Sequence, residues 1–155
     1  MTGMRNISGR IAKTTRRVGL LAIFLAATAL AQGARSNLQE GNGPPVEPAF
    51  ARVEEGLANG DADRLSPLLG SQTYLSLFDG SQGYYSSGQA FYLLQDFFRV
   101  NRPVSFKFVN KHDGDAPYAT GEYQYETRGR RNVARVYAAF KRDGSSWKLS
   151  QLSIQ

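Results

Sequence analysis

The spacing of apolar residues changes at Pro103, and this change constrains the fold more than any other feature of the sequence. Before it, apolar residues recur at helical intervals, as in residues 50–57. After it, Val104, Phe106 and Phe108 alternate with polar residues, the period of a half-buried strand. A helical part followed by a strand part predicts an α+β domain.

Residues that typically start or end helices give the positions of the first two predicted helices. Pro48 suits the first turn of a helix, Asn59-Gly60 ends that helix, and Asp61 can cap a short second one. A small hairpin is predicted over residues 73–85.

The most apolar of the predicted helices of the domain begins after residue 86. Ser86 and Gln89 have the spacing of a capping box, which predicts the start of this helix. Its apolar residues cover more than one face, so we expect it to be largely buried.

Residues 104–154 predict a four-strand antiparallel meander with short links. In the last strand Trp147 and Leu149 share one face and Leu152 the other, which predicts a bulge near Ser150-Gln151. The spacing of Val133 and Val136 suggests a second bulge. Because bulges let a sheet curl, we predict a curved antiparallel sheet wrapped around the long helix.

Residues 1–31 have the pattern of a signal peptide. They carry five basic residues and no acid, and an apolar run extends from Val18 to Ala31. Ala29-Leu30-Ala31 fits signal peptidase, and the run is shorter than the roughly 20 residues of a membrane span. We therefore predict export to the periplasm or the extracellular space, with no stable membrane span after cleavage. An uncleaved anchor is the alternative. A flexible linker is predicted at 32–46 and the domain at 47–155.

Removal of the leader changes the charge. The whole chain has a formal net charge of +6, but without residues 1–31 it has fourteen basic and thirteen acidic residues. A nearly neutral domain argues against nucleic acid as a partner. The absence of cysteine excludes disulfides and thiolate ligands, and with one histidine we predict no metal and no cofactor.

Several stretches in the domain resemble a known family, domain of unknown function 4783, within the nuclear transport factor 2-like (cystatin-like cone) superfamily. The resemblance implies a curved sheet wrapped around a long helix, a cone-shaped cavity and a secreted or periplasmic single domain. Pairing of two copies through the outer face of the sheet is a further implication. It carries over no catalytic residues. The matching stretches are Gly83-Tyr84-Tyr85-Ser86, Gln89-Ala90, Leu94-Gln95-Asp96-Phe97-Phe98, Pro103-Val104-Ser105-Phe106-Lys107, Tyr118-Ala119-Thr120-Gly121, Arg135-Val136-Tyr137 and Trp147-Lys148-Leu149-Ser150-Gln151-Leu152.

Candidate site residues come from the cavity that this fold implies. Aromatic rings with polar tips suit a pocket for a small amphipathic or sugar-like ligand, although they also suit a core. Asp96 could serve as a buried base, or could lie at an exposed edge. His112 lies in a polar loop, where we expect solvent exposure and no catalytic role. The predicted ligand-binding set is Tyr85, Tyr92, Asp96, Tyr123 and Tyr125.

Charge supplies a second candidate. Residues 32–98 carry three basic and eight acidic residues, whereas residues 99–155 carry eleven basic and five acidic ones. Arg128, Arg130 and Arg131 cluster at one predicted hairpin and could bind an anionic surface. A solvated turn is the alternative.

Three functional hypotheses follow. The first is an exported, non-enzymatic binding or accessory module of the bacterial envelope, with a homodimer, a small molecule or another protein as partner. The second is a lyase-type or isomerase-type enzyme that uses Asp96 with a cavity tyrosine. The third is a basic-hairpin domain that binds anionic surfaces.

Overall fold

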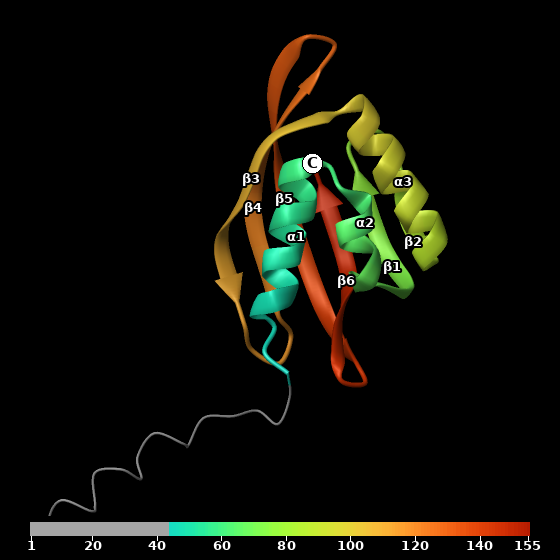
Figure 1. Cartoon of the computed structure of the whole chain (residues 1–155), viewed down its shortest axis with the longest axis vertical. Helices are drawn as coiled ribbons and strands as arrows, with labels where there is room; N and C mark the ends of the chain where they lie inside the picture. The colour runs from blue at the N-terminus through green and yellow to red at the C-terminus, as the bar shows by residue number, and fades with distance from the viewer. Residues whose placement is uncertain (1–43) are drawn as a thin grey trace, which may run out of the picture. The chain divides into compact units, whose positions relative to one another are not determined.

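The computed structural model describes residues 44–155 (Figure 1). The predicted signal peptide and most of the predicted linker lie outside the described residues. The last linker residues contact the domain: Val46 is buried, and the indole N–H of Trp147 donates to the Pro44 carbonyl at 2.8 Å. The domain therefore includes residues before 47.

Local signals place the helices as predicted. Gly60 adopts a left-handed conformation (φ 65°) that ends the first helix, and the Asp61 carboxylate accepts from the Arg64 N–H. Ser86 and Gln89 form both hydrogen bonds of a capping box. The helical elements are α1 (Glu47–Asn59), α2 (Ala62–Leu65), the short 3-10 helix η1 (Ser66–Leu68) and α3 (Ser87–Val100).

Six strands form one sheet in the order β2-β1-β6-β5-β4-β3. Neighbours are antiparallel except β1 and β6, which run parallel. The predicted four-strand meander is confirmed, and the β1–β2 hairpin extends the sheet beyond β6. The strands are β1 (Leu69–Leu77), β2 (Gln82–Tyr85), β3 (Arg102–His112), β4 (Tyr118–Thr127), β5 (Arg130–Asp143) and β6 (Ser146–Ile154).

The bulges fall only partly where the sequence placed them. Ala139 pairs with Gln151 and Phe140 with Leu149, so Ser150 is the extra residue and the predicted bulge in β6 is confirmed. The bulge predicted from the spacing of Val133 and Val136 is wrong, because β4 and β5 pair without a register shift. The spacing arises because Val133 lies on the solvent side of the sheet, 62% exposed, while Val136 faces the core.

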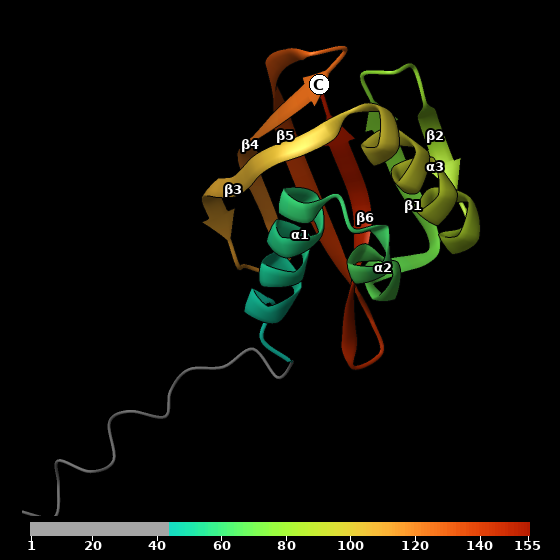
Figure 2. The same ribbon diagram turned by 45° about the horizontal axis from the view of Figure 1, so that its top comes forward.

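The helices cover one face of the curved sheet, which we call the inner face (Figures 1 and 2). Successive side chains of a strand point to opposite faces of the sheet, and we call the side opposite the helices the outer face. The prediction that α3 is largely buried is wrong: it buries one stripe only, and Tyr92 is 65% exposed. None of the helices within residues 44–155 is long and apolar enough to cross a membrane.

Candidate functional site

Two of the predicted ligand-binding tyrosines lie together on the inner face of β4. Tyr123 is fully buried, and its hydroxyl donates to the Asn101 carbonyl at 2.9 Å. Its ring stacks on Tyr125 with centroids 5.5 Å apart. Burial, and secondarily the nearby Tyr125 phenol, raises the pKa of the Tyr123 phenol well above the usual value of tyrosine.

Aromatic rings fill the space around Tyr123. Phe97 and Phe106 are 2% and 4% exposed. The Phe78 ring lies 4.9 Å from that of Phe97 and 4.8 Å from that of Tyr125, centroid to centroid. The inner face at Tyr123 is therefore packed core, with the tyrosine hydroxyl held by the backbone.

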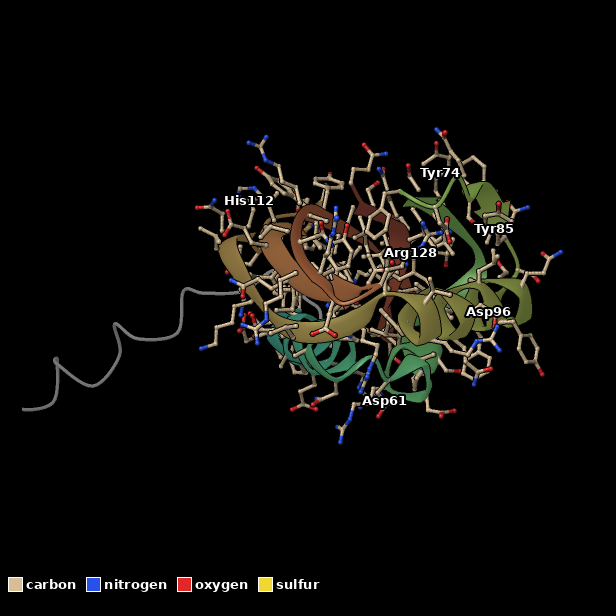
Figure 3. The ribbon with its side chains drawn as sticks, turned by 90° about the horizontal axis from the view of Figure 1, so that it is seen from above. Asp61, Tyr74, Tyr85, Asp96, His112 and Arg128 are labelled. Atoms are coloured by element: carbon tan, nitrogen blue, oxygen red, sulfur yellow. The ribbon has the colours of Figure 1, made fainter. Side chains whose placement is uncertain are left out.

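The other members of the predicted set lie elsewhere. Tyr92 and Asp96 lie on the exposed side of α3, and the Asp96 carboxylate pairs with Arg99 at 2.9 Å. Tyr85, in β2, is half-buried against the edge of the core. His112 is exposed at the end of β3, and Figure 3 shows it at the opposite end of the domain from Asp96. The structure thus brings Tyr123 and Tyr125 together but leaves Tyr92 and Asp96 at the solvent.

The predicted arginine cluster lies at the tip of the β4–β5 hairpin. Thr127 pairs with Arg130, so Arg128 and Gly129 form a two-residue turn with φ values of 51° and 72°. Two positive φ angles are typical of a type I′ turn, which favours Asn-Gly. All three arginines are exposed, and Arg131 lies opposite Glu126.

The turn conformation gives a first prediction. Replacing Arg128 with asparagine should raise the free energy of unfolding by about 0.5–1 kcal/mol, since asparagine tolerates positive φ better than arginine. Urea unfolding measures the change. Arg130→Asn is the matched control, because Arg130 is in a strand where asparagine is disfavoured, and it should give no gain. Equal stability of the native chain and R128N would contradict the prediction.

The outer face of the sheet carries a groove of about 460 Å³. It crosses strands β3 to β6 and ends at the C-terminal residue, Gln155, whose N–H and carbonyl both hydrogen-bond to Arg135. The Gln155 side chain donates to the Ser76 hydroxyl at 2.6 Å. The groove is lined by Val109, Asn110, Thr120, Gly121, Glu122, Arg135, Val136, Tyr137, Ser153 and Gln155.

A bulge in β3 shapes one wall of this groove. Phe108 pairs with Gly121 and Asn110 with Thr120, so Val109 is an extra residue in β3. Val109 is 69% exposed beside the groove. A bulge of this kind re-aims side chains, and here it gives the wall both an apolar and an amide group.

Charged side chains form two rows across the outer face. In one row Glu122 lies between Lys107 and Arg135, and in the other Glu126 lies between Arg102 and Arg131. Directly opposite residues on adjacent strands have Cβ atoms about 5 Å apart, so each acid is flanked by two cations. Within residues 44–155, none of these six side chains takes part in an ion pair shorter than 4.0 Å.

Aromatic rings lie beside the groove, on the side toward the β3–β4 loop. Tyr118 stacks on Tyr137 with centroids 5.8 Å apart, and His112 lies 5.2 Å from Tyr118. Tyr118 is 39% exposed. We call Tyr118 and Tyr137 the aromatic ledge; Tyr137 also lines the groove.

Sequence reasoning did not identify the residues of the outer-face groove. Alternation in residues 118–126 puts Glu122 and Gln124 on the opposite face from Tyr123 and Tyr125. The signal that could have led to the site is the same alternation in β5, which puts Arg135 and Tyr137 on one face. The pairing register puts Arg135 beside Glu122 and Tyr137 beside Thr120. The sequence of either strand taken alone does not specify this register.

The sequence matches the family described as "Domain of unknown function (DUF4783)" over residues 50–155. The chain belongs to this family. The match runs from within α1 to the end of β6 but brings no assigned activity. No curated protein matches the chain.

Solved structures agree on the fold. A DUF4783 family protein from Bacteroides ovatus is 19% identical, with a TM-score of 0.60 over 67% of this chain and 91% of that one. A family member from Bacteroides uniformis is 17% identical, with a TM-score of 0.62 over 68% and 94%. An NTF2-like protein of unknown function in nutrient uptake from Rhodospirillum rubrum is 11% identical, with a TM-score of 0.55 over 72% and 98%. The nuclear transport factor 2-like fold is thus shown.

Proposed function

We propose that this DUF4783 protein is an exported, non-enzymatic binding module of the bacterial envelope that engages its partner through the outer face of the sheet. The groove on that face carries the proposal. It combines charged, amide, hydroxyl and aromatic side chains on rigid strands, the arrangement that positions a ligand. The leader at residues 1–31 supports export.

The enzyme alternative has less support from the geometry. The Asp96 side chain is 66% exposed and pairs with Arg99, so it lies at the solvent-facing side of α3 and away from the packed inner face. The buried hydroxyl of Tyr123 is already donated to the Asn101 carbonyl. The Asp96 carboxylate and the Tyr123 hydroxyl therefore each have their own partner and lie in different environments, one exposed and one buried.

A second copy of the chain is one partner that the outer face could accept. Because Glu122 and Arg135 are neighbours, two faces related by a two-fold axis could place the acid of each copy opposite the base of the other. Val109 and Tyr118 add exposed apolar surface there.

Fractionation of cells that express the full chain tests the proposal. We expect the chain in the envelope or periplasmic fraction with an N-terminus at Gln32, since cleavage after Ala31 removes the leader. The purified mature protein should bind washed envelopes. Thr120→Trp, which fills the groove, should reduce binding severalfold, whereas Gln95→Trp on the exposed side of α3 should not.

Two results would overturn the proposal: retention of the uncleaved chain in the cytoplasm, or envelope binding by T120W equal to that of the native protein. Circular dichroism of T120W verifies that the fold is kept. Sedimentation equilibrium of the native protein and T120W identifies a second copy as the partner if only the native protein dimerises.

A further inference from the structure

We infer that the outer-face groove binds an acidic glycan, a polymer of sugar rings that carries carboxylate groups. The inference rests on the proposed function, because it names the ligand class of the same face. Three independent properties of the face support it: the hydrogen-bonding groups of the groove, the aromatic ledge and the surplus of cations.

The groove offers both donors and acceptors to a ligand rich in hydroxyls. Asn110 and the hydroxyls of Thr120 and Ser153 can donate and accept, Glu122 accepts, and Arg135 donates. A purely apolar ligand would leave these groups without water or partner, which costs free energy. The shallow groove also remains open to solvent, as suits a polar chain that lies across a surface.

The aromatic ledge adds a flat apolar contact. The rings of Tyr118 and Tyr137 are stacked at 5.8 Å and lie next to the polar residues of the groove. Sugar rings have apolar C–H faces, and an aromatic ring with a polar tip can pack against such a face while its hydroxyl reaches a neighbour. Arg135 lies two residues from Tyr137 on the same face of β5, so one sugar can meet both.

Cations outnumber acids on this face, which favours an acidic over a neutral glycan. In the two rows, four cations flank two acids, and Arg128 lies beyond them at the turn. Arg131 and Arg135 are four residues apart on one face, about 13 Å along the strand. Repeated cations suit a polymer with repeated carboxylates, and a guanidinium can bind a carboxylate with two hydrogen bonds.

Titration calorimetry and amide NMR with defined saccharides test the inference. The probes are a hexamer of galacturonate and the neutral maltohexaose, added to the mature protein at low and at 0.5 M salt. We expect the acidic hexamer to bind, to shift the amide signals of Thr120 and Tyr137, and to weaken with salt. Maltohexaose should bind at least about tenfold more weakly, because it lacks the charge-assisted contacts.

Matched variants test whether binding depends on the residues of the outer face or only on the net charge of the protein. Arg135→Gln should weaken binding of the acidic hexamer about tenfold, and Tyr137→Ala should weaken it severalfold. Arg99→Gln makes the same charge change on α3, where Arg99 pairs with Asp96, and Tyr92→Ala removes an exposed ring from the same helix. Both controls should bind as the native protein does.

Three outcomes would overturn the inference: no binding of the hexamer, equal binding of both saccharides, or equal effects of R135Q and R99Q. If the hexamer does not bind while T120W still reduces binding to envelopes, the acidic-glycan inference is lost and the proposed function stands. If T120W leaves envelope binding unchanged, the proposed function is lost irrespective of the hexamer.

Discussion

Replacing Gly121 with alanine should lower the free energy of unfolding by about 3 kcal/mol, because β3 and β4 approach too closely for a side chain there. A Cβ at this position would collide with the Lys107 carbonyl and would lie 2.9 Å from Cε2 of Phe106. The carbonyl belongs to the β3 backbone, which cannot shift without loosening its pairing with β4. Urea unfolding of the native chain and G121A measures the loss.

Gly88→Ala is the matched control for this substitution. Gly88 lies in the first turn of α3, and no atom lies within 4 Å of a Cβ built there. Alanine should therefore raise the free energy of unfolding by about 0.5 kcal/mol, through a less flexible unfolded chain. If G121A and G88A had the same stability, the close approach of β3 and β4 would not be a constraint on the fold.

Gly121 also links the core to the proposed binding face. It pairs with Phe108 immediately before the Val109 bulge, and its backbone lines the groove. G121A that still folds should therefore disturb the wall formed by Val109 and Asn110. The amide NMR signals of these two residues would report that displacement.

The elements that the sequence predicted are those with local causes. The capping box at Ser86, the left-handed Gly60 and the Asp61 cap each depend on residues within a few positions. The change of phase between Leu149 and Leu152 likewise revealed the bulge at Ser150 within one strand. Interactions between residues close in the chain therefore sufficed to predict the α+β order and the meander. The cone-like fold was implied by the family resemblance.

The features that the sequence did not predict depend on partners distant in the chain. The parallel pairing of β1 with β6 joins Leu75 to Leu152, and no pattern within either strand specifies it. The alternation around Val109 reads as a plain strand, since a bulge there appears only against the register of β4. Tyr92 and Asp96 were grouped with Tyr123 because a helix of mixed apolar residues does not reveal which stripe its neighbours cover.

The groove residues on the outer face were not predicted for the same reason. Arg135, Glu122 and Tyr137 are each ordinary surface residues of a half-buried strand, and the sequence contains no motif that joins them. The pairing register of β3, β4 and β5 puts Glu122 next to Arg135 and lets the Tyr137 ring stack on Tyr118. A binding surface built on a sheet is therefore visible only once the pairing is known.

Tyr123→Phe should reduce the free energy of unfolding at pH 7 by about 1–3 kcal/mol, because the buried Asn101 carbonyl loses its donor. The same variant should also change the response to alkali. Burial raises the pKa of the Tyr123 phenol in the folded chain above the usual 10 that applies in the unfolded chain. Above pH 10 the unfolded chain can release a proton that the folded chain retains, so this tyrosine makes the native protein less stable as pH rises.

The alkaline loss from one such group is about 1.4 kcal/mol per pH unit above 10. Between pH 7 and pH 11 the native chain should therefore lose about 1.4 kcal/mol more than Y123F, as measured by urea unfolding at constant ionic strength. Tyr92→Phe is the control for loss of a tyrosine hydroxyl: Tyr92 is 65% exposed, so this substitution should leave the free energy of unfolding at pH 7 unchanged. A parallel decline in the native chain and Y123F would mean that the Tyr123 hydroxyl is ionised as readily when folded as when unfolded. That result would contradict the packed inner face, and with it the argument that places binding on the outer face of the sheet.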